Sequence, residues 1–167
     1  LTLHFCNTNM MLMFLMRDGK ADTVVEQFDM LTGLLGLEEF HKIFPVILTD
    51  NGSEFKHTRE LETTDDGKKR TKVFYCDPQA SWQKPQIEKN HEFIRYVLPK
   101  GKTLNLYTQE DITVLMNNIN SIRRESLGNK SPYEATADKS ILRLMELMGL
   151  HLIPADEIRL TSDLLKR

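Results

Sequence analysis

The chain has 167 residues, 40% of them hydrophobic, with eight glycines, six prolines and two cysteines. This length and composition are typical of a globular domain, and they exclude collagen-like, disordered and disulfide-scaffold classes. The longest uninterrupted apolar run, Met10 to Met16, is far shorter than the roughly 20 residues of a membrane-spanning helix, so we expect no membrane partner. The net charge of −2 argues mildly against a dedicated nucleic-acid-binding domain, although basic residues gather between Lys84 and Lys102.

The chain starts at Leu1 rather than at a methionine, and no signal-peptide pattern follows. We therefore expect it to be a piece of a longer protein. Cys6 and Cys76 have neither C-x-x-C spacing nor a histidine pair at zinc-ligand distance, so a reducing compartment fits best.

The first third of the chain predicts a hairpin, a helix and another strand. The hairpin joins Leu1–Cys6 to Met10–Met16, and the second of these runs lacks polar alternation, as is typical of a strand covered on both faces. A T-x-x-E capping box at Thr23 indicates a helix that ends near Gly36. Residues Pro45–Thr49 then form a short buried-strand pattern.

The rest of the chain predicts one more strand and several helices. A short helix can start at Glu54, and Asp66-Gly67 indicates a hairpin turn before a strand at Thr71–Tyr75. The basic residues at this hairpin tip could approach DNA or keep an exposed edge soluble: Lys68, Lys69, Arg70 and Lys72. The helices that follow are predicted from Gln83 or Gln86 to Leu98 and from Thr108 to Arg124, where Thr108 can cap the helix with Asp111 at its third position. A capping box at Ser131 starts another helix, and Lys139 to Met148 forms one more before a charged tail to Arg167. A hairpin, a helical crossover and further strands together predict an α/β fold with a mixed sheet.

Asp50 carries the most informative pattern. A buried apolar strand places this aspartate at its carboxyl end, and Asn51-Gly52 turns the chain so that the carboxylate stays at the rim of the sheet. Such a position suits a metal ligand. The alternative is that Asp50 only begins an Asp-Asn-Gly turn.

A second informative segment is the helix that contains Glu88. Glu88, Glu92 and Arg95 recur at i, i+4 and i+7, so they share one face beside the apolar stripe. The alternative is an ordinary solvated face, since most charges on helices face water.

Taken together, these segments resemble the DDE transposase and retroviral-integrase superfamily, and within it the bacterial insertion-sequence transposases of the IS-thirty type. The resemblance covers nearly the whole chain and rests on separated matches in the same order, at residues 1–5, 45–55, 74–78, 88–95, 98–101, 131–134 and 153–157. It implies a ribonuclease-H-like mixed sheet flanked by helices, with a triad of acidic residues that hold divalent metal for cutting and joining DNA. On this basis residues 1–136 are expected to form an integrase catalytic core that lacks its first strand, and residues 137–167 a C-terminal helical extension.

The resemblance assigns catalytic and metal-binding roles to two residues. Asp50 matches the second acidic position and Glu88 the third, whereas Glu54 and Glu92 fall outside the matching positions. The first aspartate of the pattern is expected on a strand upstream of Leu1, so the fragment alone is expected to be inactive or nearly so. Pro85 departs from the glycine usual in relatives, which puts the geometry of the preceding loop in doubt.

The expected cofactor is Mg²⁺ in a two-metal site, with Mn²⁺ as a substitute. Two hard cations about 3.5–4 Å apart stabilise the attacking and leaving oxygens of a phosphodiester displacement, and carboxylates are the ligands that they prefer. Near this site, candidate DNA contacts are Lys84, Lys89, Asn90, His91 and Arg95. For the lysines the alternative is a solvated side chain, and for His91 it is a packing role. Trp82 could stack on a base or anchor its loop.

The leading hypothesis is therefore the catalytic core of a DNA transposase that performs strand cleavage and strand transfer. The expected partners are double-stranded DNA, as transposon ends and target, and further copies of the chain, in the bacterial cytoplasm and at the nucleoid when bound to DNA. Two alternatives stay open: a catalytically inactive, truncated transposase that binds DNA or partner subunits, and a ribonuclease-H-like nuclease.

Overall fold

The computed structural model describes residues 1–77 and 85–165. Their contacts divide the chain into two compact units, Leu1–Leu15 with Lys84–Arg167 and Met16–Gln83. The division differs from the boundary after residue 136 that the sequence predicts, and that boundary stays a prediction. Each unit combines helices with a two-stranded sheet, so the predicted α/β class is confirmed. No helix in the described ranges is long and apolar enough to cross a membrane.

The first unit contains the predicted hairpin. Strands β1 (Thr2–His4) and β2 (Met11–Met13) pair antiparallel, with Leu3 opposite Leu12. The hydrogen bonds at its two ends join Phe5 N–H to the Met10 carbonyl and Phe14 N–H to the Leu1 carbonyl, both at 2.8 Å. All of β2 is buried, which confirms that this methionine-rich strand is covered. Both strands are shorter than the sequence predicts.

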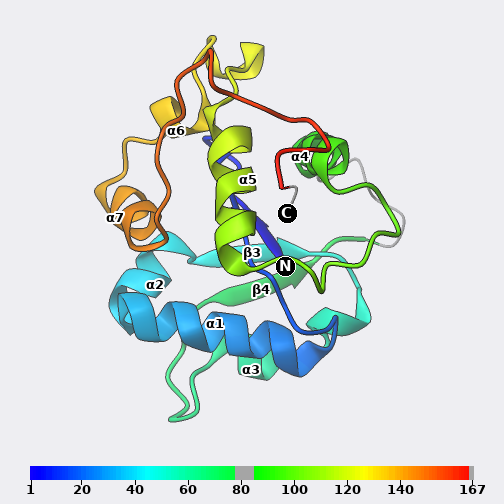
Figure 1. The fold of residues 1–167 in the computed structure, drawn as a ribbon. Coiled ribbons are helices and arrows are strands. Elements are labelled where there is room, and N and C mark those ends of the chain that lie inside the picture. Colours follow the sequence, from blue (N-terminus) through cyan, green and yellow to red (C-terminus); the bar gives the residue numbers. More distant parts are fainter. Residues whose placement is uncertain (78–84, 166–167) are drawn as a thin grey trace. The chain divides into compact units, whose positions relative to one another are not determined.

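Helix α5 (Gln109–Ser121) covers the other edge of β2, and Figure 1 shows it lying alongside the hairpin. The Asn120 amide accepts a hydrogen bond from Met11 N–H at 2.9 Å and donates one to the Met11 carbonyl at 2.8 Å. Gln109 repeats this pattern, since it accepts from Leu15 N–H at 2.8 Å and donates to the Met13 carbonyl at 3.0 Å. Two side-chain amides thus replace a neighbouring strand, so this edge of the sheet cannot pair further.

Short helices and a tail complete the first unit: α4 (Pro85–Val97), η3 (Glu125–Leu127), α6 (Pro132–Ala135) and α7 (Lys139–Leu147). The capping box at Ser131 is confirmed, and so is the one that Thr108 forms with Asp111 at the start of α5. After α7 the described residues form no further helix. The tail is held instead by polar side chains of α5, because Asn117, Ser121 and Asn118 accept hydrogen bonds from the backbone N–H groups of His151, Ile153 and Arg159.

The second unit is built on two parallel strands, β3 (Val46–Thr49) and β4 (Lys72–Tyr75). Val46 lies opposite Lys72 and Thr49 opposite Tyr75. The helices of this unit are α1 (Ala21–Leu35), α2 (Leu37–Ile43), η1 (Ser53–Phe55) and α3 (Thr58–Glu62). Helix α1 contacts α2, η1 and α3, and α3 contacts β4, so the parallel pair is connected to the helices mainly through α3.

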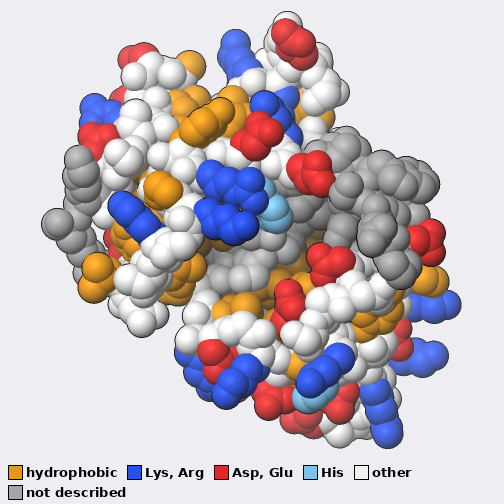
Figure 2. Space-filling view, turned by 90° about the vertical axis from the view of Figure 1, so that its right-hand side faces the viewer, with side chains coloured by type: hydrophobic (Ala, Val, Ile, Leu, Met, Phe, Trp, Pro, Cys, Tyr) orange, Lys and Arg blue, Asp and Glu red, His pale blue; other side chains and the backbone are white. Residues whose placement is uncertain are grey.

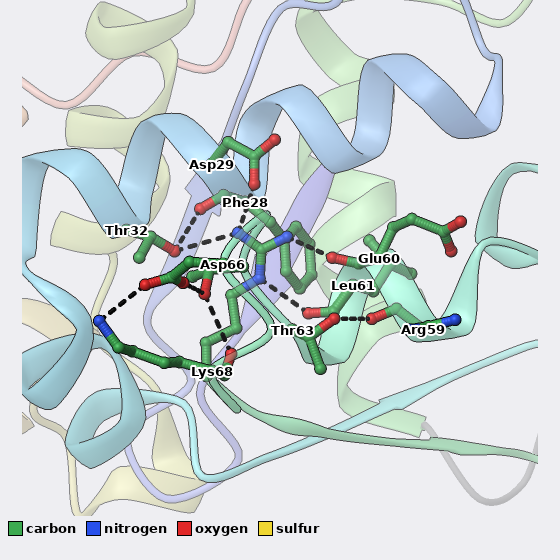
Figure 3. Close-up of polar contacts among 11 residues, drawn as sticks. Phe28, Asp29, Thr32, Arg59, Glu60, Leu61, Thr63, Asp66 and Lys68 are labelled. Atoms are coloured by element: carbon green, nitrogen blue, oxygen red, sulfur yellow. Dashed lines mark hydrogen bonds and ion pairs between the residues drawn. The ribbon is translucent and has the colours of Figure 1, made fainter.

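Arg70 organises this second unit (Figure 3). Its side chain is fully buried, and its guanidinium donates to the carbonyl of Leu61 at 2.9 Å, the carbonyl of Glu60 at 2.5 Å and the carboxylate of Asp29 at 2.5 Å. The guanidinium carbon also lies 5.6 Å from the centre of the Phe28 ring. One side chain therefore joins α1, the end of α3 and the start of β4.

Four sequence expectations for the second unit are corrected. Thr23 does not cap a helix, because α1 begins at Ala21 and the Thr23 hydroxyl donates to Asp18 instead. The hairpin turn at Asp66-Gly67 forms, but only the isolated bridge between Thr63 and Lys69 flanks it. Arg70 is no exposed tip residue, and helix α2 lies in a segment where the sequence predicts none.

Strand β3 is also less buried than predicted. Val46 and Leu48 expose 55% and 46% of their surface. In the described chain β4 is the only strand that pairs with β3. Val46 and Leu48 are two residues apart, so they lie on the same face of the strand, and this face is open to solvent.

We predict that Arg70→Met lowers the free energy of unfolding by roughly 3 kcal/mol or more, because the variant leaves an aspartate and two buried carbonyls without their donor. Denaturant unfolding of the chain measures this loss. Arg59→Met is the matched control, since Arg59 is exposed, and it is expected to change stability by less than about 0.5 kcal/mol. Equal losses in the two variants would contradict the role assigned to Arg70.

We predict that Asn120→Ala costs about 2 kcal/mol or more, because both backbone groups of buried Met11 lose their partner. Thermal and denaturant unfolding measure the loss. Asn105→Ala serves as the control, because Asn105 is exposed. A stability loss below about 0.5 kcal/mol in Asn120→Ala would show that water replaces the amide without cost.

Candidate functional site

Asp50 directly follows β3, as the sequence predicts, and it is exposed. Because β3 and β4 are parallel, their carboxyl ends meet at one edge of the sheet. The pairing continues past both strands, since Cys76 N–H donates to the Thr49 carbonyl at 2.7 Å and the Asn51 amide donates to the Cys76 carbonyl at 3.2 Å. Asp77 follows β4 by two residues, so a second exposed acidic residue lies after the neighbouring strand. The position of Asp77 after a strand is a sequence signal of the same kind as that of Asp50.

The turn after Asp50 orients its carboxylate. Gly52 N–H donates to Asp50 Oδ1 at 3.1 Å, so the aspartate forms an Asx-type turn. Asp50 can therefore begin this turn and still serve as a metal ligand. Glu54, in η1, bends back over Gly52: a Cβ at position 52 would lie 2.5 Å from Glu54 Oε2. The backbone at Gly52 is not left-handed, and the atoms that a Cβ would meet are the far end of the flexible Glu54 side chain, which can move aside.

Helix α4 carries Glu88 in its first turn, exposed to solvent. One turn later, Glu92 accepts a hydrogen bond from Lys89 at 2.8 Å, and this contact raises the pKa of Lys89. Glu92 is thus engaged in an ion pair on the helix surface, which fits the solvated alternative for this face.

The predicted DNA contacts on α4 lie on different faces. Lys89 and Arg95 are exposed, whereas Asn90 is fully buried. His91 is half-buried, and its Nε2 hydrogen bonds with the Thr2 hydroxyl at 3.4 Å, which fits the packing role. Two further residues named from the sequence, Lys84 and Trp82, lie outside the described residues.

Two basic residues that the sequence did not single out, His4 and Arg124, lie near one another, and His4 also lies near His91. Burial lowers the pKa of His4 to about 4, with further contributions from the positive charges of Arg124 and His91. Burial also lowers the pKa of Arg124 to about 10. These residues are about 120 positions apart along the chain, so no local pattern could have linked them.

The donor chemistry of Asp50 and Glu88 fits a hard divalent cation, because both offer carboxylate oxygens. The two residues belong to different compact units. Within residues 1–77 and 85–165, no three His, Cys, Asp or Glu side chains form a group that could hold a metal ion. Two of the three acidic positions that the resemblance implies are therefore present as exposed side chains, without a complete ligand group.

We predict that His4 makes stability pH-dependent in acid. Because its pKa in the folded chain lies below the ordinary value, the unfolded chain binds the proton first, so this contribution is complete above about pH 6.5 and is lost as the pH falls toward 4. A shift of one pKa unit corresponds to about 1.4 kcal/mol, and partial exposure reduces the effect, so we expect a loss of about 1–2 kcal/mol.

Denaturant unfolding of His4→Gln and of the unsubstituted chain, each at pH 7 and at pH 4, tests this prediction. The difference between the two chains isolates the contribution of His4 from that of the carboxylates. The substituted chain is expected to lose less stability on acidification. An NMR titration of the His4 ring with a midpoint near 6.5 would contradict the prediction.

Comparisons with known proteins support the resemblance. The chain is 31% identical over 88 residues to the transposase for insertion sequence element IS1086 of Cupriavidus metallidurans, an alignment that covers 53% of this chain and 25% of that protein. It is 36% identical over 63 residues to transposase InsI for insertion sequence element IS30A of Escherichia coli, covering 38% of this chain and 16% of that protein. A putative integrase, ORF3 of a Spiroplasma virus, is 36% identical over 81 residues, covering 48% and 24%.

No family model matches the chain. In these three comparisons, the aligned part of the chain spans a quarter or less of the relative's length. The names of these relatives agree with the family that the sequence resembles. They confirm that this chain is similar to insertion-sequence transposases, including one of the IS30 type, and to an integrase.

Proposed function

We propose that this chain is part of the catalytic core of a DNA transposase that performs metal-dependent strand cleavage and strand transfer. The observation that carries the proposal is the position of Asp50, at the carboxyl end of a strand in a parallel pair, in a chain similar to transposases. A ribonuclease-H-like sheet is part of the proposal. The antiparallel hairpin β1–β2 and the parallel pair β3–β4 are the two kinds of pairing that such a mixed sheet contains.

Asp50 and Glu88 are proposed as the metal-binding and catalytic carboxylates, together with an aspartate upstream of Leu1. Mg²⁺ held there, or Mn²⁺ in its place, would stabilise the charge that develops on the attacking and leaving oxygens of the phosphodiester. The turn at Gly52 holds the Asp50 carboxylate at the end of the strand before any ligand binds, which reduces the entropy lost on binding. Glu92 is not proposed as a ligand, because its carboxylate already pairs with Lys89.

Double-stranded DNA is the proposed partner, and homo-oligomers on paired DNA ends are the proposed assembly. Lys89 and Arg95 have exposed cationic side chains suited to phosphate contacts, and Lys84 is retained from the sequence pattern. His91 and Asn90 are proposed to position the DNA-binding face of α4 rather than to contact DNA from the surface, since one hydrogen bonds to Thr2 and the other is buried. The proposed location is the cytoplasm, at the nucleoid when DNA is bound.

A second candidate function is a transposase-derived module that binds DNA or a partner subunit without cleavage. A ribonuclease-H-like nuclease is the third possibility, and it would hydrolyse DNA without joining strands.

The test is a strand-cleavage and strand-transfer assay with Mg²⁺ or Mn²⁺ on a longer protein that includes the upstream strand. We predict that Asp50→Asn and Glu88→Gln each lower the rate at least about 100-fold, because each removes a charged ligand from the metal. Glu92→Gln is the matched control, one helical turn away on α4, and it is expected to keep the rate within about threefold.

Three results separate the candidate functions. Cleavage without strand joining would favour the nuclease. DNA binding without cleavage under either metal would favour the binding module. Loss of activity in Glu92→Gln together with normal activity in Glu88→Gln would contradict the assignment of the glutamate ligand.

A further inference from the structure

Arg124 is half-buried and has no acidic partner among the described residues. Its guanidinium carbon lies 5.2 Å from the centre of the Phe93 ring, and Nη2 reaches the Ile119 carbonyl at a long 3.5 Å. Its Nε is buried and has no hydrogen-bond partner. Across the described chain, Arg124 forms no ion pair with a carboxylate. A partly buried cation in this state is costly, and an anion from outside the chain would remove much of the cost.

Buried polar atoms of two neighbouring side chains also lack partners. Asn90 is fully buried, and neither its amide nitrogen nor its amide oxygen has a hydrogen-bond partner. On α4 it lies one turn before Phe93, the ring that Arg124 covers. The Nε2 atom of His4 is buried and unpartnered as well, and His4 lies close enough to Arg124 for the positive charge to lower its pKa. Buried polar groups without partners are rare, and three residues of this kind together call for a ligand or ordered water.

Of the three side chains, that of Arg124 is the one that an anion from outside can reach. Arg124 is half-buried and its guanidinium is a donor, whereas the Asn90 amide and the His4 Nε2 are closed to solvent. Lys89 adds a positive charge nearby, since its Nζ lies 5.8 Å from the centre of the same Phe93 ring. On the face drawn in Figure 2, Lys and Arg side chains gather beside a histidine side chain.

We propose that Arg124 binds a phosphate group of a DNA strand that runs along α4, with Asn90 and His4 as buried neighbours that do not contact the phosphate. This inference rests on the proposed function and adds a contact to it, because Arg124 lies 29 positions beyond the last DNA contact predicted from sequence, Arg95. An arginine fork matches phosphate geometry, and a partly buried guanidinium loses less hydration than an ammonium when it binds. A DNA phosphodiester and free inorganic phosphate share this chemistry, and the experiment separates them.

The experiment measures the binding of a fluorescent 20-base-pair DNA duplex to the full chain by anisotropy, over a series of salt concentrations. Arg124→Gln is expected to weaken binding about three- to tenfold and to lower the slope of log affinity against log salt by about one, since one phosphate contact is lost. Arg123→Gln is the matched control. Arg123 is the adjacent, exposed arginine and pairs with Glu134 at 3.4 Å, so its substitution is expected to leave the slope unchanged.

A second measurement does not depend on a variant that folds. In NMR titrations at constant ionic strength, the side-chain amide signals of Asn90 are expected to shift with the duplex, and more weakly with millimolar inorganic phosphate, but not with chloride. A shift with phosphate and none with the duplex would assign the site to the free ion and overturn the proposal.

The outcomes separate this inference from the proposed function. If the unsubstituted chain binds the duplex and the two arginine variants share its salt slope, the Arg124 contact is wrong while DNA binding stands. If the chain does not bind the duplex at all, the DNA-binding part of the proposed function fails, and this inference with it. If no anion moves the Asn90 signals, ordered water is what satisfies these groups.

Discussion

The arrangement of the second unit depends on the hydrogen bonds that the buried guanidinium of Arg70 requires. Arg70 occurs directly before Thr71, whose hydroxyl donates to the Phe44 carbonyl at 2.6 Å, and before Lys72, whose N–H donates to the Pro45 carbonyl at 3.2 Å. Once Arg70 is bound to α1 and α3, the start of β4 is placed against the start of β3, and the parallel register follows. That register decides which residue leaves the sheet at its carboxyl edge, so the position of Asp50 depends on contacts made at the opposite end of the strands.

Local patterns predicted the elements that local interactions build. The capping boxes at Thr108 and Ser131 satisfy helix N–H groups within three residues, and both were predicted correctly. Thr23 shows the limit of such patterns, because Asp18 competes for its hydroxyl. No sequence pattern predicts the burial of Arg70, because basic residues beside a turn are usually solvated. The partners of Arg70 also lie up to 41 positions away along the chain.

The candidate site also contains residues that local sequence patterns predict and residues that only the fold brings together. Asp50 was predictable because a strand followed by a tight turn is a local signal, and the structure places it after β3 as expected. Whether Asn90 lies on an exposed or a buried face depends on which elements pack against α4. The spacing of residues along the helix does not give this information. Arg124 and His4 come together only through the fold. Their significance lies in unsatisfied atoms, a property that exists only in three dimensions.

The edge of β2 that α5 covers also bears on the order of folding. The hydrogen bonds between Met11 and Asn120 join residues 109 positions apart, whereas the second unit is one continuous segment. During synthesis the second unit can therefore form while the methionine-rich hairpin still lacks its covering helix. Until Asn120 has left the ribosome, that hairpin presents an open, apolar strand edge to the cell. Chaperone binding and aggregation during translation are thus expected to act on residues 1–15, which are synthesised well before the helix that covers them.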